Sequence, residues 1–158
     1  MRRRFPVIFL AALLLGGSAA ARDIPTAGVT MEEVTAWLQQ KGYQTELRTS
    51  ADGRQHIYTG VEPDHFGVYL YDCKEGRCGS LQFAAGYTTK GAFSGDSLNT
   101  WNRANRWGRA YFDDVHDPWV EMDVDLTPGG SWELLDDDLA TWKSMVLRFG
   151  KLARHEAP

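Results

Sequence analysis

The sequence FGVYLYDCKEGRCGSLQFAAGY at residues 66–87 predicts a β-hairpin whose tight loop is flanked by two cysteines. If Cys73 lies opposite Cys78, antiparallel pairing places Leu70 opposite Leu81 and gathers the apolar side chains on one face. The sulfurs, the tyrosines and the polar groups then share the other face. A slip of one residue would mix the two faces, so the hydrophobic pattern supports this register independently of the cysteines.

We expect Cys73 and Cys78 to form a structural disulfide, because opposed residues at a non-hydrogen-bonded site come close enough for the bond. Two alternatives remain open. A redox-active dithiol usually has C-x-x-C spacing and a helical context, which this pair lacks. A metal site would need further ligands, since the pair supplies two of four. The disulfide requires an oxidising compartment.

The N-terminal segment, residues 1–21, resembles a secretory signal peptide. Arg2, Arg3 and Arg4 form a basic start, an apolar stretch over residues 6–15 follows, and small residues precede a cleavage site after Ala21. An uncleaved anchor is the alternative. The sequence has no cysteine at the cleavage site to carry a lipid, and we expect no membrane span after cleavage. The predicted location is the periplasm or the extracellular medium.

Cleavage would leave 137 residues, enough for one domain with one core. The full chain has 17 basic and 21 acidic residues, a net charge of −4. Cleavage would remove three of the basic residues and change the net charge to −7. Such an acidic chain is a poor candidate for binding nucleic acid. We predict a linker at residues 22–29, a single domain at 30–152 and a polar tail at 153–158.

Hydrophobic periodicity and turn residues predict the other elements of this domain. A capping box at Thr30 and Glu33 begins the first helix. Asp96 or Ser97 is expected to cap the second helix, Ser131 to cap the third, and Gly150 to end the third. The predicted helices are 31–41, 98–104 and 132–149, and the predicted strands besides the hairpin are 43–49, 55–61, 109–113 and 119–126.

This order, α-β-β-β-β-α-β-β-α, places the strands in runs that do not alternate with helices. The fold class is therefore predicted as α+β, an antiparallel sheet with helices on one face. The strand at 119–126 alternates apolar and acidic residues, so we expect one of its faces to be buried and the other to be acidic and solvated.

Three segments together resemble the YbjN family of proposed bacterial sensory transduction regulators. They are the Asp72-Cys73 to Cys78 hairpin with its Leu81-Gln82-Phe83, the run WNRANRWGRAY at 101–111, and the strand around Glu121-Met122-Asp123. The run at 101–111 is the specific part. The resemblance implies a fold similar to type III secretion chaperones, which are often dimeric. It implies no known reaction and no agreed catalytic residues.

Within that run, Arg103, Arg106 and Arg109 recur every three residues. They are candidates for an anion site, since guanidinium groups bind carboxylates in a bidentate way. The alternative is structural: the arginines pair with the acidic strand, and Asn102 and Asn105 bond backbone groups where the helix passes into the strand. The acidic residues of that strand are Glu121, Asp123 and Asp125.

We expect no metal or cofactor site. The spacing of the acidic strand does not match an EF-hand loop. No two of the four histidines have ligand spacing, and His116, in an acidic turn, is the one weak candidate. The sequence also lacks a G-x-S-x-G element, a P-loop and a dinucleotide fingerprint.

The sequence therefore favours a periplasmic or secreted interaction or regulatory module that is not an enzyme. Its expected partner is an unidentified protein, and a homodimer is also considered. The predicted interaction surface comprises Tyr69, Tyr71, Arg103, Arg106 and Arg109. One alternative is a small metal- or anion-binding protein or enzyme that uses Arg109, Glu121 and Asp123. Another is a chaperone for an exported polypeptide, which follows from fold analogy alone.

Overall fold

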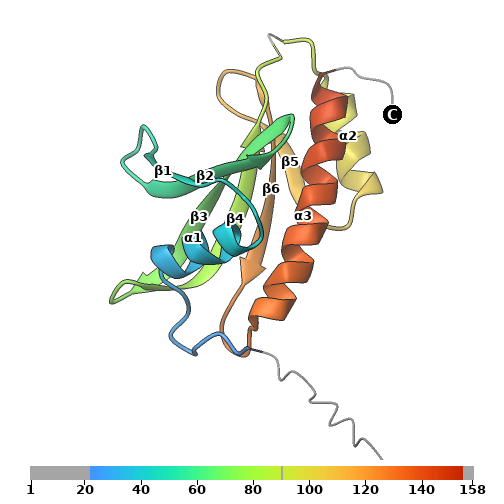
Figure 1. Cartoon of the computed structure of the whole chain (residues 1–158). Coiled ribbons are helices and arrows are strands. Elements are labelled where there is room, and N and C mark those ends of the chain that lie inside the picture. The colour runs from blue at the N-terminus through green and yellow to red at the C-terminus, as the bar shows by residue number, and fades with distance from the viewer. Residues whose placement is uncertain (1–21, 90, 155–158) are drawn as a thin grey trace, which may run out of the picture.

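The computed structural model describes residues 22–89 and 91–154, and its elements follow the predicted order α-β-β-β-β-α-β-β-α (Figure 1). The helices are α1 (Met31–Gln40), α2 (Gly95–Ala104) and α3 (Trp132–Ala153). The strands are β1 (Glu46–Thr49), β2 (Gln55–Val61), β3 (Asp64–Lys74), β4 (Arg77–Gly86), β5 (Arg109–Phe112) and β6 (Pro118–Asp125). The predicted signal peptide at residues 1–21 lies outside the described residues.

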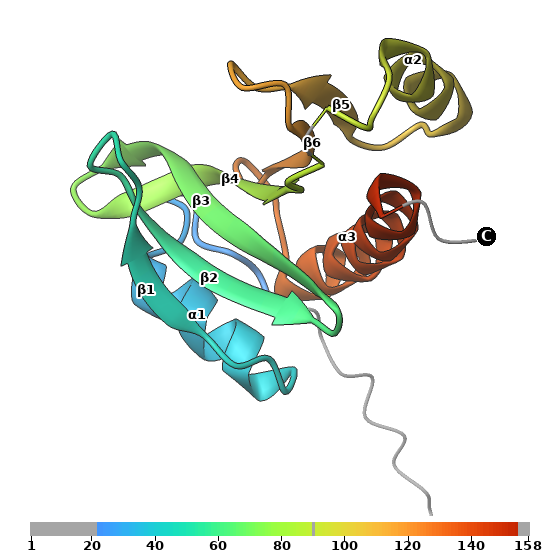
Figure 2. The same ribbon diagram turned by 90° about the horizontal axis from the view of Figure 1, so that it is seen from above.

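The six strands form one antiparallel sheet in the order β1-β2-β3-β4-β6-β5. The first four strands are neighbours in the order of the sequence. The chain then crosses to the far edge as β5 and returns as β6 between β4 and β5. Figure 2 shows that this sheet is strongly curved, with β1 at one edge and β5 at the other. The α+β class is confirmed.

The hairpin of β3 and β4 has the predicted register. Leu70 faces Leu81, and Cys73 faces Cys78. The sulfurs of Cys73 and Cys78 lie at bonding distance, 2.14 Å apart. The hairpin also contacts residues 22–29, because Val29 and Cys78 of β4 exchange backbone hydrogen bonds.

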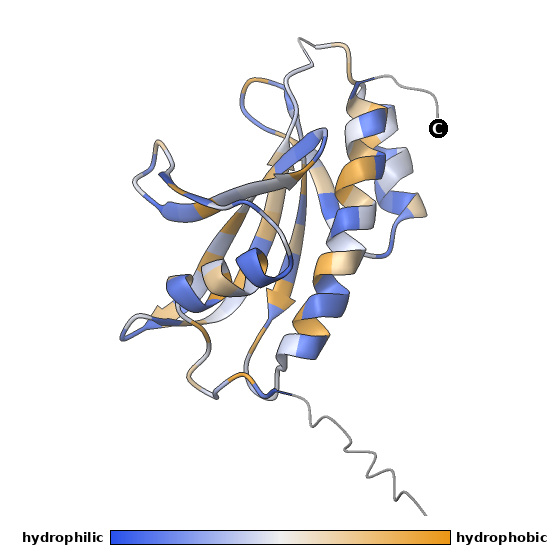
Figure 3. Ribbon diagram, in the orientation of Figure 1, coloured by the Kyte–Doolittle hydropathy of each residue, from blue (hydrophilic) through white to orange (hydrophobic). Residues whose placement is uncertain are grey.

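The core lies between one face of the sheet and the helices α1 and α3 (Figure 2). Trp142 of α3 is fully buried and stacks on Phe83 of β4 with the ring centroids 5.7 Å apart, while Phe66 of β3 meets its edge. One side of α3 is apolar and buried, with Leu135, Leu139, Trp142, Val146 and Phe149 facing the sheet. Polar residues alternate with this apolar stripe along the helix (Figure 3). Residues 22–29 add the buried side chains of Ile24 and Val29 to this core.

Two helix boundaries differ from the prediction. The capping box of α1 at Thr30 and Glu33 is confirmed. However, α2 begins one turn earlier than expected, because Ser94, and neither Asp96 nor Ser97, accepts the capping hydrogen bond. The α3 helix continues through Gly150 to Ala153. Gly150 serves close packing inside this helix, so the expectation that it ends the helix is wrong.

The edge strand β1 is shorter than predicted. Residues 43–45 do not pair with β2 by a backbone ladder, and the Thr59 hydroxyl instead donates to the carbonyl of Gln44. All four residues of β1 are exposed. Among the described residues, no helix has the length and apolar character needed to cross a membrane.

Candidate functional site

The second face of the sheet carries the polar and aromatic residues, and no described helix packs on it. We call it the outer face and define it by the residues whose side chains alternate with the core. From β2 to β5 they are His56, Tyr58, His65, Tyr69, Tyr71, Ser80, Gln82, Trp119, Glu121, Asp123, Asp125, Arg109 and Tyr111. Strands β3, β4 and β6 position the centre of this face by pairing side by side.

One half of the outer face is a row of hydrogen bonds that crosses three strands. Arg54, in the turn before β2, donates to the Tyr71 hydroxyl at 2.8 Å. The Tyr71 hydroxyl lies 3.5 Å from the side-chain oxygen of Gln82, whose amide donates to Asp123 at 2.7 Å. Gln82 is 8 % exposed, so its amide is held in one orientation by its two neighbours.

The other half is built around the carboxylate of Glu121, which is 8 % exposed. Arg109 donates to one of its oxygens through two nitrogens, at 2.9 and 3.2 Å, and Tyr111 donates its hydroxyl to the other at 2.6 Å. Arg109 also lies 3.6 Å from Asp123, which joins the two halves. We call the seven residues the polar network: Arg54, Tyr71, Gln82, Asp123, Arg109, Glu121 and Tyr111.

The pKa values of three network residues are shifted. The pKa of Arg54 is raised, first by its hydrogen bond to Asp52 and then by the one to Tyr71. Partial burial, and then the hydrogen bond to the Glu121 carboxylate, raise the pKa of Tyr111 above its ordinary value. The hydrogen bond to Glu121 raises the pKa of Arg109, despite some opposing desolvation. Tyr111 therefore stays a hydrogen-bond donor and Arg109 stays charged throughout the physiological pH range.

The network borders an open depression of about 460 Å³ that is lined by Tyr71, Gln82, Arg109, Tyr111 and Glu121. Its walls present hydroxyl, amide and guanidinium groups that are already oriented. Arg109 is 63 % exposed at its side chain and Tyr111 is 37 % exposed as a residue, so both can be reached from solvent. A partner could bind there without reordering the side chains.

Aromatic rings cover the glycines of the outer face. The Tyr69 ring lies over Gly67, and a Cβ on that glycine would be 2.6 Å from the ring. In the same way Trp119 lies over Gly86, with its ring 2.4 Å from the place of a Cβ. Tyr69 in turn stacks on His56 with the centroids 4.6 Å apart. The glycines thus let the rings lie flat on the sheet, which gives the face a broad aromatic surface beside the polar network.

The structure brings together three of the five residues predicted for the interaction surface. Tyr69, Tyr71 and Arg109 share the outer face. Arg103 lies on α2, where its guanidinium donates to Thr100, and Arg106 lies over the ring of Trp107 at 5.1 Å. Among the described residues, neither forms a hydrogen bond or an ion pair with the acidic strand. The structural alternative, in which the arginines pair with that strand, therefore holds for Arg109 alone of the three.

Sequence reasoning missed Arg54, in the turn before β2, and it also missed Gln82 and Tyr111 on the strands. The two strand residues have the strand parity of the outer face, since Gln82 alternates with Leu81 and Phe83, and Tyr111 alternates with Ala110 and Phe112. That parity was the available signal. It shows which face a side chain occupies, but not that β4 and β6 are neighbours.

The structural role proposed for the asparagines is confirmed. The Asn102 side chain bonds both backbone groups of Ala110, accepting from its N–H at 2.8 Å and donating to its carbonyl at 3.0 Å. Asn105 donates to the carbonyl of Trp101 at 2.8 Å, beyond the last turn of α2. These bonds fix α2 against the edge of β5.

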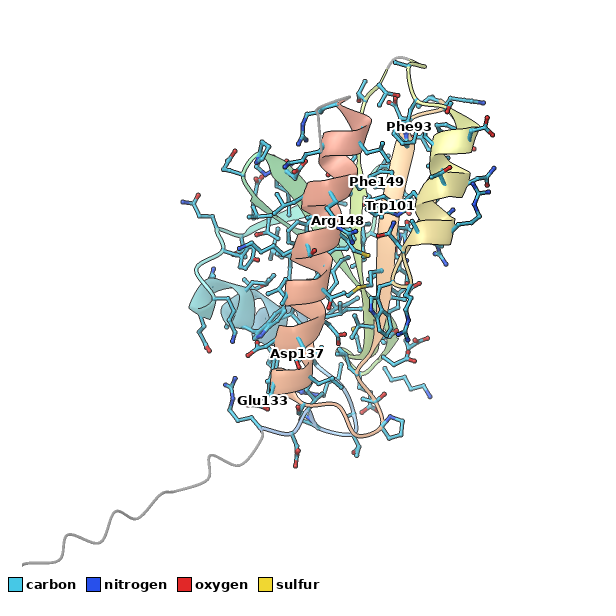
Figure 4. All side chains as sticks on the ribbon, turned by 90° about the vertical axis from the view of Figure 1, so that its right-hand side faces the viewer. Phe93, Trp101, Glu133, Asp137, Arg148 and Phe149 are labelled. Carbon is cyan, nitrogen blue, oxygen red and sulfur yellow. A yellow bond between two sulfur atoms is a disulfide. The ribbon has the colours of Figure 1, made fainter. Side chains whose placement is uncertain are left out.

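On the other side of α2, Trp101 packs edge-on against Phe149 of α3, with the centroids 5.0 Å apart, and Arg148 lies over the Trp101 ring (Figure 4). This contact orders α2 through hydrophobic packing. In the described part of the chain, no three His, Cys, Asp or Glu side chains are placed to hold a metal ion.

The model of the YbjN family, described as "Putative bacterial sensory transduction regulator", matches residues 30–153. No curated protein matches the chain. The matched region contains every helix and strand of the fold. It also contains all seven residues of the polar network, six of them on strands and Arg54 in the turn before β2. The chain therefore belongs to the YbjN family.

Proposed function

We propose that this protein is a periplasmic regulatory module that acts without catalysis and binds a partner protein on its outer face. The observation that carries the proposal is the polar network, which runs across four strands on a face that no described helix covers. A solvated sheet face needs no such continuous set of mutual hydrogen bonds, and a pre-oriented set lowers the entropy lost on binding.

The composition of the face fits a protein partner. Tyrosine, tryptophan and arginine are enriched where protein surfaces bind, because they combine apolar area with hydrogen-bond donors. The outer face presents Tyr71, Tyr111, Trp119 and Arg109 around a shallow depression. Its breadth suits a flat surface on a folded partner more than a small molecule, which usually binds in an enclosed pocket.

The chemistry of the face gives less support to a catalyst or an anion site. Both oxygens of Glu121 already accept hydrogen bonds, and Arg109 already pairs with two carboxylates. An anion would have to displace Glu121 or Asp123 from Arg109. The periplasmic location is supported by the signal-like segment at residues 1–21 and by the Cys73–Cys78 pair.

Site-specific crosslinking in living cells tests the partner. A photoreactive amino acid at position 71 or 111 of the full chain should give a defined adduct with another protein. The control carries the photoreactive amino acid in place of Lys143, which is exposed on α3, and should give no such adduct. Arg109→Glu should weaken the adduct formed at position 71. An equal adduct from position 143, or none from the outer face, would refute the proposal.

The location is tested separately by joining residues 1–29 to alkaline phosphatase, which becomes active after export. We expect an active fusion. Replacement of Arg2, Arg3 and Arg4 by glutamate should lower its activity if the basic start directs export. An inactive fusion would remove the periplasmic part of the proposal and leave the binding face to be judged by the crosslinks.

A further inference from the structure

The two edges of the sheet differ in what blocks them. At β5, the side chain of Asn102 occupies both outward-facing backbone groups of Ala110. At β1, every residue is exposed, and Leu47 is 57 % exposed. An unblocked edge is a template for another strand, and proteins usually cover or interrupt it. The β1 edge is therefore the place where the sheet could be extended.

The hydrogen-bond alternation of the β1–β2 hairpin shows which backbone groups face that edge. The N–H of Ser50 bonds the carbonyl of Arg54 beside the turn. Antiparallel pairs alternate along a ladder, so Arg48 and Glu46 are the next residues bonded to β2. The N–H and carbonyl groups of Leu47 and Thr49 consequently point away from β2, toward solvent.

The charges of β1 are arranged to match a second copy of the same strand. We propose that two copies of this protein pair through β1, antiparallel, with the two-fold axis at Leu47. In this register Leu47 faces Leu47 of the second copy, and Thr45 faces Thr49. The outward-facing backbone groups of the two strands then meet in hydrogen-bonded pairs.

The same register places Glu46 directly opposite Arg48 of the second copy, twice, on the outer face. Within one chain these side chains already form an ion pair of 2.7 Å, and the Arg48 guanidinium lies 3.4 Å above the ring of Tyr58. Opposite charges on directly opposed residues stabilise an antiparallel pair, and like charges destabilise it. A shift of one residue would break this charge match and separate the two leucines.

On the helix-bearing face, the pairing covers the exposed side chain of Leu47, which lies opposite the buried Ile57. The two six-stranded sheets would become one sheet of twelve strands with two outer faces. The contact is one short strand from each copy, so it is smaller than about 1,200 Å², which is typical of weak interfaces. The dimer should therefore form reversibly and depend on concentration.

Charge reversal tests this register without removing the strand. In the Glu46→Arg homodimer, an arginine at position 46 would face an arginine at position 48. In the Arg48→Glu homodimer, a glutamate would face a glutamate at the same two positions. Each variant should dimerise at least about tenfold more weakly than the wild type, whereas an equimolar mixture should form heterodimers, because every cross-strand pair is then opposite in charge. The double variant Glu46→Arg/Arg48→Glu should recover the homodimer. Misfolding of a variant would not produce this recovery.

Leu47→Pro is a second, independent test. In the monomer, the backbone N–H of residue 47 points to solvent, so an edge strand tolerates proline there. In the dimer, the same proline would remove a hydrogen bond to the second copy and its ring would obstruct the pairing. Arg103→Glu on α2 is the matched control for a change of surface charge. Circular dichroism should show that both variants keep the fold, with the proline variant monomeric and the control unchanged.

The measurement is sedimentation equilibrium of protein purified after expression of the full chain, up to about 0.5 mM because the interface is small. A wild type that is monomeric at every concentration would overturn the proposal. So would a dimer that charge reversal and Leu47→Pro leave unchanged, because it would use another surface. Dimerisation does not depend on what the outer face binds, so neither result bears on the crosslinking experiment.

Discussion

The carboxylate of Asp64 occupies the space where a side chain on residue 150 would begin. A Cβ at Gly150 would lie 2.1 Å from Asp64 Oδ1. The Asp64 side chain is fully buried at the start of β3, and it pairs with Arg154 at the end of α3. Gly150 therefore leaves room for the buried carboxylate of this ion pair, which joins the end of α3 to the sheet.

Gly150→Ala should lower the free energy of unfolding by about 3 kcal/mol or more, because the new methyl group forces Asp64 away from its partner and leaves a buried charge uncompensated. Chemical denaturation measures the change. The matched control is Gly95→Ala in the first turn of α2, where nothing lies within 4 Å of the new Cβ. This control should be neutral or slightly stabilising, since alanine is the better helix former. An equal loss in both variants would contradict the explanation.

Asp136 on α3 joins that helix to α1. It accepts a hydrogen bond from the Trp37 indole at 2.8 Å and pairs with Lys41. Burial alone would raise the pKa of Asp136, but the hydrogen bonds from Lys41 and Trp37 outweigh it, so its pKa is lowered. A lowered pKa means that the carboxylate stabilises the fold above the ordinary pKa, and that this contribution is lost as the pH falls through the folded value.

Asp136→Asn should therefore reduce stability at pH 7 by about 0.5–1 kcal/mol, a small value because both partners are about one-third exposed. The difference from the wild type should disappear near pH 2. Thermal unfolding across this pH range checks the prediction. Asp137→Asn, which changes an exposed neighbour on the same helix, is the control and should not reproduce this loss of stability at pH 7. A deficit in Asp136→Asn that persists in acid would show that the carboxylate charge is not the cause.

Asn102→Ala should lower stability by about 1–3 kcal/mol, because Ala110 is 6 % exposed and loses the partners of both its backbone groups. Asn99→Ala is the control, since Asn99 is exposed on the same helix, and it should be neutral. Denaturation curves measure stability, and hydrogen exchange at the Ala110 amide should quicken in Asn102→Ala. Unchanged exchange at that amide would mean that another group protects the edge of β5.

The sequence predicted the hairpin register because pairing Cys73 with Cys78 places all the large aliphatic side chains and both phenylalanines of the stretch on one face. The sequence did not predict the role of Gly150. A glycine that follows the apolar stripe of a helix looks the same in the sequence whether it ends the helix or leaves room for a neighbouring carboxylate. The difference lies in Asp64, which is 86 residues earlier in the chain.

The polar network could be predicted from the sequence in part. Parity placed Tyr69 and Tyr71 on one face, and the alternation of β6 placed Glu121 and Asp123 on an outward face. The bond between Gln82 and Asp123, however, requires β6 to pair with β4 after the chain has already formed β5. Local patterns do not encode the order of strands that are distant in sequence.

Replacement of Cys73 and Cys78 by alanine should lower stability by about 2 kcal/mol, the entropy expected for closing so short a loop. The register should survive, because the apolar pairs of β3 and β4 specify it as well. Reductant should lower the stability of the wild type by a similar amount and leave the variant unchanged. A variant that no longer folds would show that the bond, and not the side-chain pattern, sets the register.

The burial of Tyr87, the residue after β4, predicts how the stability of the protein changes in alkali. Burial, and then the negative charge of Asp64, raise the pKa of Tyr87 above its ordinary value, and its hydroxyl donates to the carbonyl of Val146 at 3.2 Å. A group whose pKa is raised in the folded state contributes its full stabilisation below the pKa of the unfolded chain, which is about 10 for tyrosine. This stabilisation is lost progressively as the pH rises above that value. Stability should therefore fall above about pH 10.

Tyr87→Phe should make this alkaline decline less steep, although it lowers stability at pH 7 by about 1 kcal/mol through the lost hydrogen bond. Part of the decline should remain, because the pKa values of Tyr111 and Tyr43 are also raised. Denaturation at several pH values measures the slope. Ultraviolet titration of the wild type should show fewer tyrosines ionising near pH 10 in the folded protein than in urea, where the unfolded chain exposes all six. An alkaline slope that is the same with and without the Tyr87 hydroxyl would assign the decline to another group.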